Sequence, residues 1–144
     1  MTHTFDLQRF IRAQDTIYAT ALQELRSGHK RSHWMWFIFP QVLGLGSSPT
    51  SRLYSIASAD EARAYWNHPV LGSRLSECTQ AVLALRDLSA EQIFSYPDHL
   101  KFRSSMTLFD RAVQDSDLFG AALRKYFGGE ADPMTLRLLT EPLH

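Results

Sequence analysis

The sequence predicts an all-α fold, a single irregular domain of about seven mostly short, non-repeating packed helices spanning residues 1–144. Apolar residues recur at helical spacing along most of the chain, and capping residues, glycines and prolines separate the segments. No segment shows the sustained alternation of polar and apolar residues that is typical of a strand. A chain of 144 residues is long enough to bury one core and fits one domain.

The first predicted helix covers residues 5–26, because Phe10, Ile17 and Leu25 belong to one apolar stripe. Gly28 stands where a left-handed C-terminal cap is expected. Gln14 falls on the same stripe. A buried amide needs hydrogen-bond partners, so Gln14 either ties helices together or contacts a ligand.

The middle of the chain carries two capping-box patterns. Ser58 with Glu61 predicts a helix through residue 66, and Ser89 with Gln92 predicts a short helix that ends before residue 96. Between them, residues 69–85 form a helix with Pro69 in its first turn. Cys78 lies on the apolar stripe of that helix, which predicts a small core residue and not a nucleophile.

Three helices are predicted for the C-terminal part. Residues 97–113 form the first of them, beginning at Pro97-Asp98. Ser116 caps the second, which Gly128-Gly129 closes, and Asp132-Pro133 caps the last, which runs to residue 139.

Composition excludes several classes of function. Fifteen basic and fifteen acidic residues cancel, which predicts no binding of nucleic-acid polymers, and the only dense basic group is His29-Lys30-Arg31. The apolar run of residues 34–39 is too short to cross a membrane, and residues 1–10 lack the apolar core of a signal peptide. One cysteine is compatible with a reducing compartment, so we expect a cytoplasmic protein. No cofactor signature is present.

Residues 34–39 are apolar on all sides and must be buried, whether they form a helix or a strand. Trp34 and Trp36 add aromatic surface that suits a planar ligand. The following loop, with Gly44, Gly46 and Ser47, can offer backbone N–H groups and hydroxyls to a phosphate or carboxylate. However, it lacks the third glycine of a dinucleotide fingerprint and the Gly-Lys-Ser/Thr of a Walker loop.

Several polar residues are candidates for a site. His33 is an acid–base candidate because an imidazole pKa lies near neutrality. His29 and His33 are spaced for a metal, but no third ligand is nearby, so no metal site is predicted. Arg74 could grip an anion, and Asp98, Lys101 and Ser105 share one helix face. The alternative for these residues, and for His68, is capping and surface pairing.

Several phrases together resemble a small bacterial family, DUF1810. The phrases span nearly the whole chain, and they are Arg9-Phe10 with Ala13-Gln14, His33 to Gln41, Gly44 to Ser47, Tyr54 to Ile56, His68 to Gly72, Lys101 to Phe109, and Phe127-Gly-Gly with Asp132 and Thr135-Leu136. The resemblance implies an all-α fold of short helices and brings no established activity, cofactor or partner. Members are sometimes labelled calpastatin-like, but this chain lacks the disordered composition of an unfolded inhibitor.

The family phrases contain polar residues that packing alone does not require, which are Gln14, His33, Gln41, Ser47, His68, Lys101, Ser104, Ser105 and Asp132. If they converge, they form a polar pocket lined by Trp34 and Trp36. The first hypothesis is therefore binding or processing of a small anionic, nucleotide-like ligand, with His33 as acid–base residue and Asp98 or Asp132 as its carboxylate partner. The alternatives are a non-catalytic protein- or peptide-binding module and a purely structural helical domain. The sequence identifies no protein partner.

Overall fold

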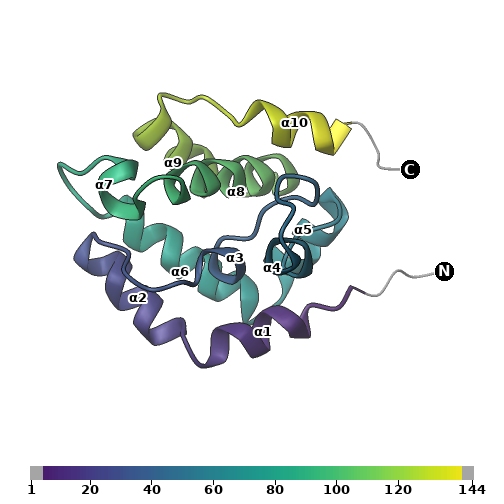
Figure 1. Ribbon diagram of the computed structural model, residues 1–144. Coiled ribbons are helices and arrows are strands. Elements are labelled where there is room, and N and C mark those ends of the chain that lie inside the picture. Colours follow the sequence, from purple (N-terminus) through teal and green to yellow (C-terminus); the bar gives the residue numbers. More distant parts are fainter. Residues whose placement is uncertain (1–4, 141–144) are drawn as a thin grey trace.

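Ten helices lie within residues 5–140, the part of the chain that the computed structural model describes (Figure 1). No strand occurs in this range, which confirms the all-α prediction, and Val42 and Ile56 form an isolated bridge. The expectation that residues 1–10 form no signal peptide falls partly on residues 1–4, which lie outside the described range. None of the helices in residues 5–140 has the length and apolar character needed to cross a bilayer.

Two helices replace the one predicted for residues 5–26, namely α1 (Gln8–Asp15) and α2 (Tyr18–Ser27). The break falls at the β-branched pair Thr16-Ile17, whose side chains crowd a continuing helix. The Ile17 amide donates to the Gln14 carbonyl three residues back, at 3.0 Å, as in a tight 3₁₀ turn. The end of α2 is as predicted, because Gly28 adopts the left-handed conformation with φ of 80°.

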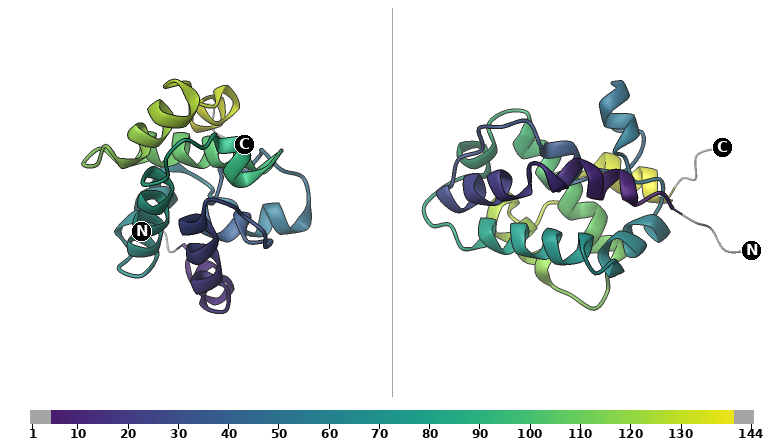
Figure 2. Two further views of the ribbon diagram at one scale, coloured as in Figure 1. Left: turned by 90° about the vertical axis from the view of Figure 1, so that its left-hand side faces the viewer. Right: turned by 90° about the horizontal axis from the view of Figure 1, so that it is seen from below.

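The sequence left residues 34–39 open between helix and strand, and the structure has the short helix α3 (Met35–Ile38) there. A second short helix, α4 (Pro49–Leu53), was not predicted. The apolar run of residues 34–39 is therefore one helical turn and not a strand. The Ser48 hydroxyl caps α4 by accepting a hydrogen bond from the Ser51 amide at 3.1 Å. The segment that carries α4 projects from the rest of the molecule (Figure 2).

Helix α5 (Ala59–Asn67) starts at the predicted cap, where the Ser58 hydroxyl accepts from the Glu61 amide at 3.2 Å. The other half of the predicted capping box is wrong. The Glu61 carboxylate accepts from the Ala57 amide at 2.7 Å and not from the Ser58 amide, and its second oxygen accepts from Arg9.

The start of α6 (Leu71–Leu83) also differs from the prediction, since Pro69 precedes the helix and does not lie in its first turn. His68 Nδ1 instead accepts hydrogen bonds from the amides of Val70 and Leu71, at 3.1 and 3.3 Å, and so caps α6. The capping box at Ser89 is confirmed in both halves and begins α7 (Ala90–Phe94).

The last three helices begin where the sequence predicts, and they are α8 (Asp98–Ala112), α9 (Leu118–Phe127) and α10 (Pro133–Thr140). Helix α8 is the longest of the ten and packs against α5, α7, α9 and α10, while α6 packs against α2, α5 and α9. In Figure 1, α8 and α10 lie above α6, and α1 and α2 lie below it. The core fills the space between these layers.

Aromatic rings dominate one end of this core. Phe94 and Phe102 stack with their centroids 4.6 Å apart, and Phe39 meets Phe102 edge-on at 5.0 Å. Cys78 is fully buried in the same continuous core, as its stripe predicted. This core fixes the positions of α3 and α8, between which the candidate site lies.

Candidate functional site

A cleft of about 440 Å³ lies between the loop after α3 and the N-terminal half of α8, and we call it the loop cleft. This volume is in the range of small-molecule sites. Its lining residues come from α3, residues 41–51, α8 and the start of α10, and they are Trp36, Gln41, Leu45, Gly46, Ser47, Ser48, Ser51, Pro97, Leu100, Lys101, Ser104 and Asp132. The structure therefore brings seven of the predicted site residues together here.

A second cleft, of about 400 Å³, shares Trp36, Pro97 and Lys101 with the first. We call it the basic cleft, because Lys30, Arg31 and Lys101 are among its lining residues. The full set is Lys30, Arg31, His33, Met35, Trp36, Phe94, Ser95, Tyr96, Pro97, Asp98 and Lys101. Two further predicted residues, His33 and Asp98, thus lie beside the loop cleft and not inside it.

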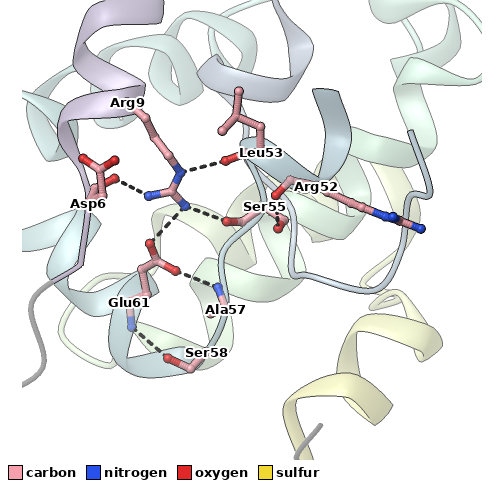
Figure 3. A network of polar contacts seen from close by, with 8 residues as sticks. All are labelled: Asp6, Arg9, Arg52, Leu53, Ser55, Ala57, Ser58 and Glu61. Carbon is pink, nitrogen blue, oxygen red and sulfur yellow. Dashed lines mark hydrogen bonds and ion pairs between the residues drawn. The ribbon is translucent and has the colours of Figure 1, made fainter. Parts of the chain in front are cut away.

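An ion pair between Arg9 and Glu61 holds the base of the loop that lines the loop cleft (Figure 3). Arg9 Nε donates to the Leu53 carbonyl at 2.7 Å, and Arg9 Nη2 donates to the Ser55 carbonyl at 2.8 Å. The bridge between Val42 and Ile56 closes the same loop from the other side of its base. The loop is therefore fixed at both of its ends while its tip lines the cleft.

The loop approaches α4 closely at Gly46. A Cβ atom at Gly46 would lie 2.5 Å from Ser51 Oγ and 2.7 Å from Ser51 Cβ, so only glycine fits without a shift of the chain. Ser48 and Ser51 hydrogen-bond to each other and cap α4. By contrast, the side chains of Gln41 and Ser47 make no hydrogen bond within the described residues.

Lys101 connects the two clefts. Its ammonium nitrogen lies 5.2 Å from the centroid of the Trp36 ring and 3.3 Å from Asp98 Oδ1. The second oxygen of Asp98 lies 2.8 Å from the Lys30 ammonium, whose side chain is only 7% exposed. One carboxylate is thus shared by two lysines, and each of these lysines is also placed over a tryptophan ring, Lys30 over Trp34 and Lys101 over Trp36.

Asp132 lies at the far end of the loop cleft and serves mainly to cap α10. Its Oδ2 accepts from the Thr135 amide at 3.1 Å and from the Thr135 hydroxyl at 2.5 Å. Ser104 Oγ lies 3.0 Å from the same oxygen, and Arg103 Nη2 lies 3.5 Å from Oδ1. Both carboxylate oxygens are therefore engaged within the fold.

Three residues predicted to bind ligand are instead internal ties. Gln14, 1% exposed, donates to the Phe37 carbonyl at 2.6 Å and to Tyr65 Oη at 2.9 Å. Trp34 is fully buried, so it cannot form the predicted wall, and its indole N–H donates to Glu24 at 2.9 Å. Arg74 is paired with Asp15 at 3.0 Å, away from both clefts.

Three more predicted residues lie outside the clefts for other reasons. His68 uses its Nδ1 to cap α6. Gly44 packs against α10, since a Cβ there would lie 3.1 Å from a methyl group of Leu138. Ser105 is fully buried on a different face of α8 from Ser104, and its hydroxyl has no partner within residues 5–140.

The predicted acid–base pair does not form. His33 is exposed at the rim of the basic cleft, and no hydrogen bond or ion pair within the described residues joins it to Asp98 or Asp132. Asp98 is occupied by two lysines and Asp132 by its capping bonds. No group of three His, Cys, Asp or Glu side chains in residues 5–140 could hold a metal ion.

Two other hollows of similar size suit an anionic ligand less well. One, of about 520 Å³, lies over α6 and contains no aromatic ring, and its ion pair between Arg26 and Glu77 already balances its charge. The other, of about 420 Å³, is lined by Val42, Leu43, Leu138 and other uncharged residues. The two clefts around Trp36 and Lys101 are the better candidates.

Sequence reasoning missed the residues that give the site its charge and its support. Lys30 and Arg31 were noted only as a short basic group, and nothing in the sequence indicated that Lys30 meets Asp98. Arg9 was noted within a family phrase, but its pairing with Glu61 joins segments that are distant in sequence.

Comparison with known proteins gives two matches and one negative result. A family model described as "Protein of unknown function (DUF1810)" matches residues 4–139. The crystal structure of the conserved hypothetical protein Rv1873 from Mycobacterium tuberculosis is similar, with a TM-score of 0.93 and 52% sequence identity. The alignment covers 94% of this chain and 97% of that chain. Among curated proteins, none matches this chain.

Proposed function

The chain belongs to the DUF1810 family, and we propose that it binds a small anionic, nucleotide-like ligand in the two clefts that share Trp36 and Lys101. The observation that carries this proposal is the ammonium group of Lys101, 5.2 Å from the centroid of the Trp36 ring. It places a positive charge over one face of an aromatic ring. A ligand with an anionic group and a planar ring needs both.

The loop cleft supports the proposal with uncommitted polar groups. The Gln41 amide and the Ser47 hydroxyl have no hydrogen-bond partner within the described residues, and both line this cleft. Ligand sites typically combine apolar walls with a few such groups, which fix orientation. Leu45 and Leu100 provide the apolar part of the wall. A base or a similar planar group would fit between these features.

The proposal concerns binding and not turnover. The groups that acid–base chemistry would need, His33 with Asp98 or Asp132, are not in mutual contact. A general base must lie within hydrogen-bonding reach of its proton and is usually oriented by a second group. Within the described residues, His33 has no such orienting partner.

Isothermal titration of the full chain with AMP, NAD and ribose 5-phosphate tests the proposal. Trp36→Leu and Lys101→Ala should each weaken binding of AMP by about tenfold or more, because stacking and charged hydrogen bonds each contribute about 1–3 kcal/mol. Lys125→Ala is a matched control, since Lys125 lies on α9 and bonds the carbonyls of Leu83 and Leu85. Absence of binding by all three compounds, or binding that neither variant weakens, would overturn the proposal.

A second candidate is recognition of a short peptide across the same clefts. Tyr96 and Leu100 favour it, because they are 72% and 39% exposed although both are large apolar residues at these clefts. Exposed apolar side chains of this kind are common in peptide-binding surfaces. If a peptide array gives binders that Tyr96→Ala and Leu100→Ala abolish while no nucleotide binds, this candidate replaces the first. If neither nucleotides nor peptides bind, the remaining alternative is a purely structural helical domain.

A further inference from the structure

The basic cleft contains more positive charge than its own carboxylate can balance. Three cationic side chains, Lys30, Arg31 and Lys101, line it together with a single carboxylate, Asp98. His33 and Tyr96 are the other titratable residues in the lining. Two of the three positive charges therefore have no counterion among the carboxylates that line the cleft.

The cation at the back of this cleft is held rigidly. The Lys30 side chain is 7% exposed, and its ammonium lies 2.8 Å from Asp98 Oδ2 and 5.1 Å from the centroid of the Trp34 ring. The Lys30 amide also donates to the Ile93 carbonyl at 2.8 Å. A charge that is already fixed in place loses little entropy when a ligand binds, unlike that of a surface lysine.

The cation at the mouth of the cleft is free. Arg31 is exposed, and its guanidinium forms no ion pair within residues 5–140. Its backbone is fixed, because the Arg31 amide donates to Glu24 Oε1 at 2.8 Å. A guanidinium can bind two oxygens of a phosphate at once, which an ammonium cannot do with the same geometry.

We propose that the basic cleft binds the doubly charged phosphate of a phosphomonoester and selects it over phosphodiesters and carboxylates. This inference rests on the proposed function, since the rest of the ligand would lie in the loop cleft. A phosphomonoester carries close to two negative charges at neutral pH and has three terminal oxygens. It therefore matches the two unbalanced positive charges, whereas a diester or a carboxylate carries only one negative charge.

Asp98 sets this selectivity. Its carboxylate already occupies the space between the two lysines, at 2.8 Å from Lys30 and 3.3 Å from Lys101. A singly charged ligand brings no more charge than Asp98 itself and competes poorly for Lys101. A doubly charged group gains enough from Lys101 and Arg31 together to bind beside Asp98, because electrostatic complementarity favours the matching charge.

The test compares ligands that differ only in their phosphate. AMP, 3′,5′-cyclic AMP and adenosine are titrated into the full-length protein at one fixed salt concentration. AMP should bind about tenfold or more tightly than cyclic AMP, and adenosine should bind most weakly. Arg31→Gln should reduce the preference for AMP over cyclic AMP without changing the affinity for adenosine. Arg12→Gln, an exposed arginine on α1, is the matched control and should change none of the three affinities.

A second variant tests the role of Asp98 separately. Asp98→Asn should strengthen binding of cyclic AMP more than binding of AMP and so narrow the selectivity. If this variant proves unstable because Lys30 loses its counterion, the Arg31→Gln comparison still decides the matter. If AMP and cyclic AMP bind equally well and Trp36→Leu weakens both, the selectivity for a phosphomonoester is overturned and the proposed function stands. Binding of none of the three would overturn both.

Discussion

The guanidinium of Arg9 lies 3.1 Å from the Glu61 carboxylate, and this pair joins α1 to the start of α5 across the base of the loop-cleft wall (Figure 3). The Glu61 side chain is only 4% exposed and the Arg9 side chain 15%. Arg9 also bonds the Leu53 and Ser55 carbonyls, and Glu61 bonds the Ala57 amide. Two backbone carbonyls and one buried carboxylate therefore depend on one arginine.

Replacing Arg9 by methionine is expected to destabilise the protein by about 3 kcal/mol, because Glu61 then keeps a buried charge without a counterion. Urea denaturation measures the change. Arg63→Met is the matched control, since its partner Asp60 and Arg63 itself are 74% and 47% exposed, and an exposed pair contributes less than about 1 kcal/mol. Equal losses of stability in the two variants would contradict the role given to Arg9.

Gln14→Leu is expected to lower the free energy of unfolding by about 1–3 kcal/mol, because the Phe37 carbonyl and Tyr65 hydroxyl lose a buried partner. The affinity for AMP should not change, since Gln14 lies outside both clefts. Gln80→Leu removes an exposed amide that bonds only Ser76, and it should shift stability by less than about 0.5 kcal/mol. A Gln14 variant with wild-type stability would show that its amide is not the tie that the distances indicate.

Cys78 is expected to be unreactive in the folded protein. Burial raises the pKa of its thiol to about 12, so almost no thiolate exists at neutral pH, and the side chain has no contact with solvent. A colorimetric thiol reagent should detect no cysteine in the native protein and one per chain after denaturation. Rapid labelling without denaturant would contradict the burial and the predicted core role of Cys78.

Local signals in the sequence were sufficient for most of the fold. Caps at Ser58, Ser89 and Asp132 and the glycine at position 28 act on neighbouring residues, so their effect is visible in a short window. The break at Thr16-Ile17 was missed, because the apolar stripe continues through it. Helix α4 was missed as well, since four of its five residues are polar or turn-forming and a single apolar residue, Leu53, makes no stripe.

Local sequence patterns predicted the part of the candidate site whose residues are close in sequence, whereas Lys101, Ser104 and Asp132 were predicted through the family phrases. Trp36, Gln41, Gly46 and Ser47 belong to one segment, and they do line one cleft. Which of two neighbouring tryptophans faces the cleft could not be read from an all-apolar run, and Trp34 proved to be buried. The pairing of Lys30 with Asp98 depends on how α2, α7 and α8 pack, which no local pattern encodes.

The ionisation of Glu24 makes the free energy of unfolding depend on pH in acid. Its carboxylate accepts hydrogen bonds from the Arg31 and Ser32 amides at 2.8 and 2.9 Å, from the Ser32 hydroxyl at 2.6 Å and from the Trp34 indole at 2.9 Å. Partial burial would raise the pKa of Glu24, but these four hydrogen bonds outweigh it and lower the pKa to about 2.

Because the folded-state pKa lies below its ordinary value of 4.5, the ionised carboxylate stabilises the fold above that pH, and this contribution is lost as the pH falls from 4.5 toward about 2. Glu24→Gln should therefore be less stable than the wild type by roughly 1–2 kcal/mol at neutral pH, with a difference that shrinks in acid. Urea titrations at a series of pH values measure it. Glu91→Gln, an exposed carboxylate without side-chain hydrogen bonds in the described residues, should follow the wild type throughout. A Glu24 variant that also follows the wild type at every pH would show that these four hydrogen bonds do not anchor Trp34 and α3, and with them Trp36, to the end of α2.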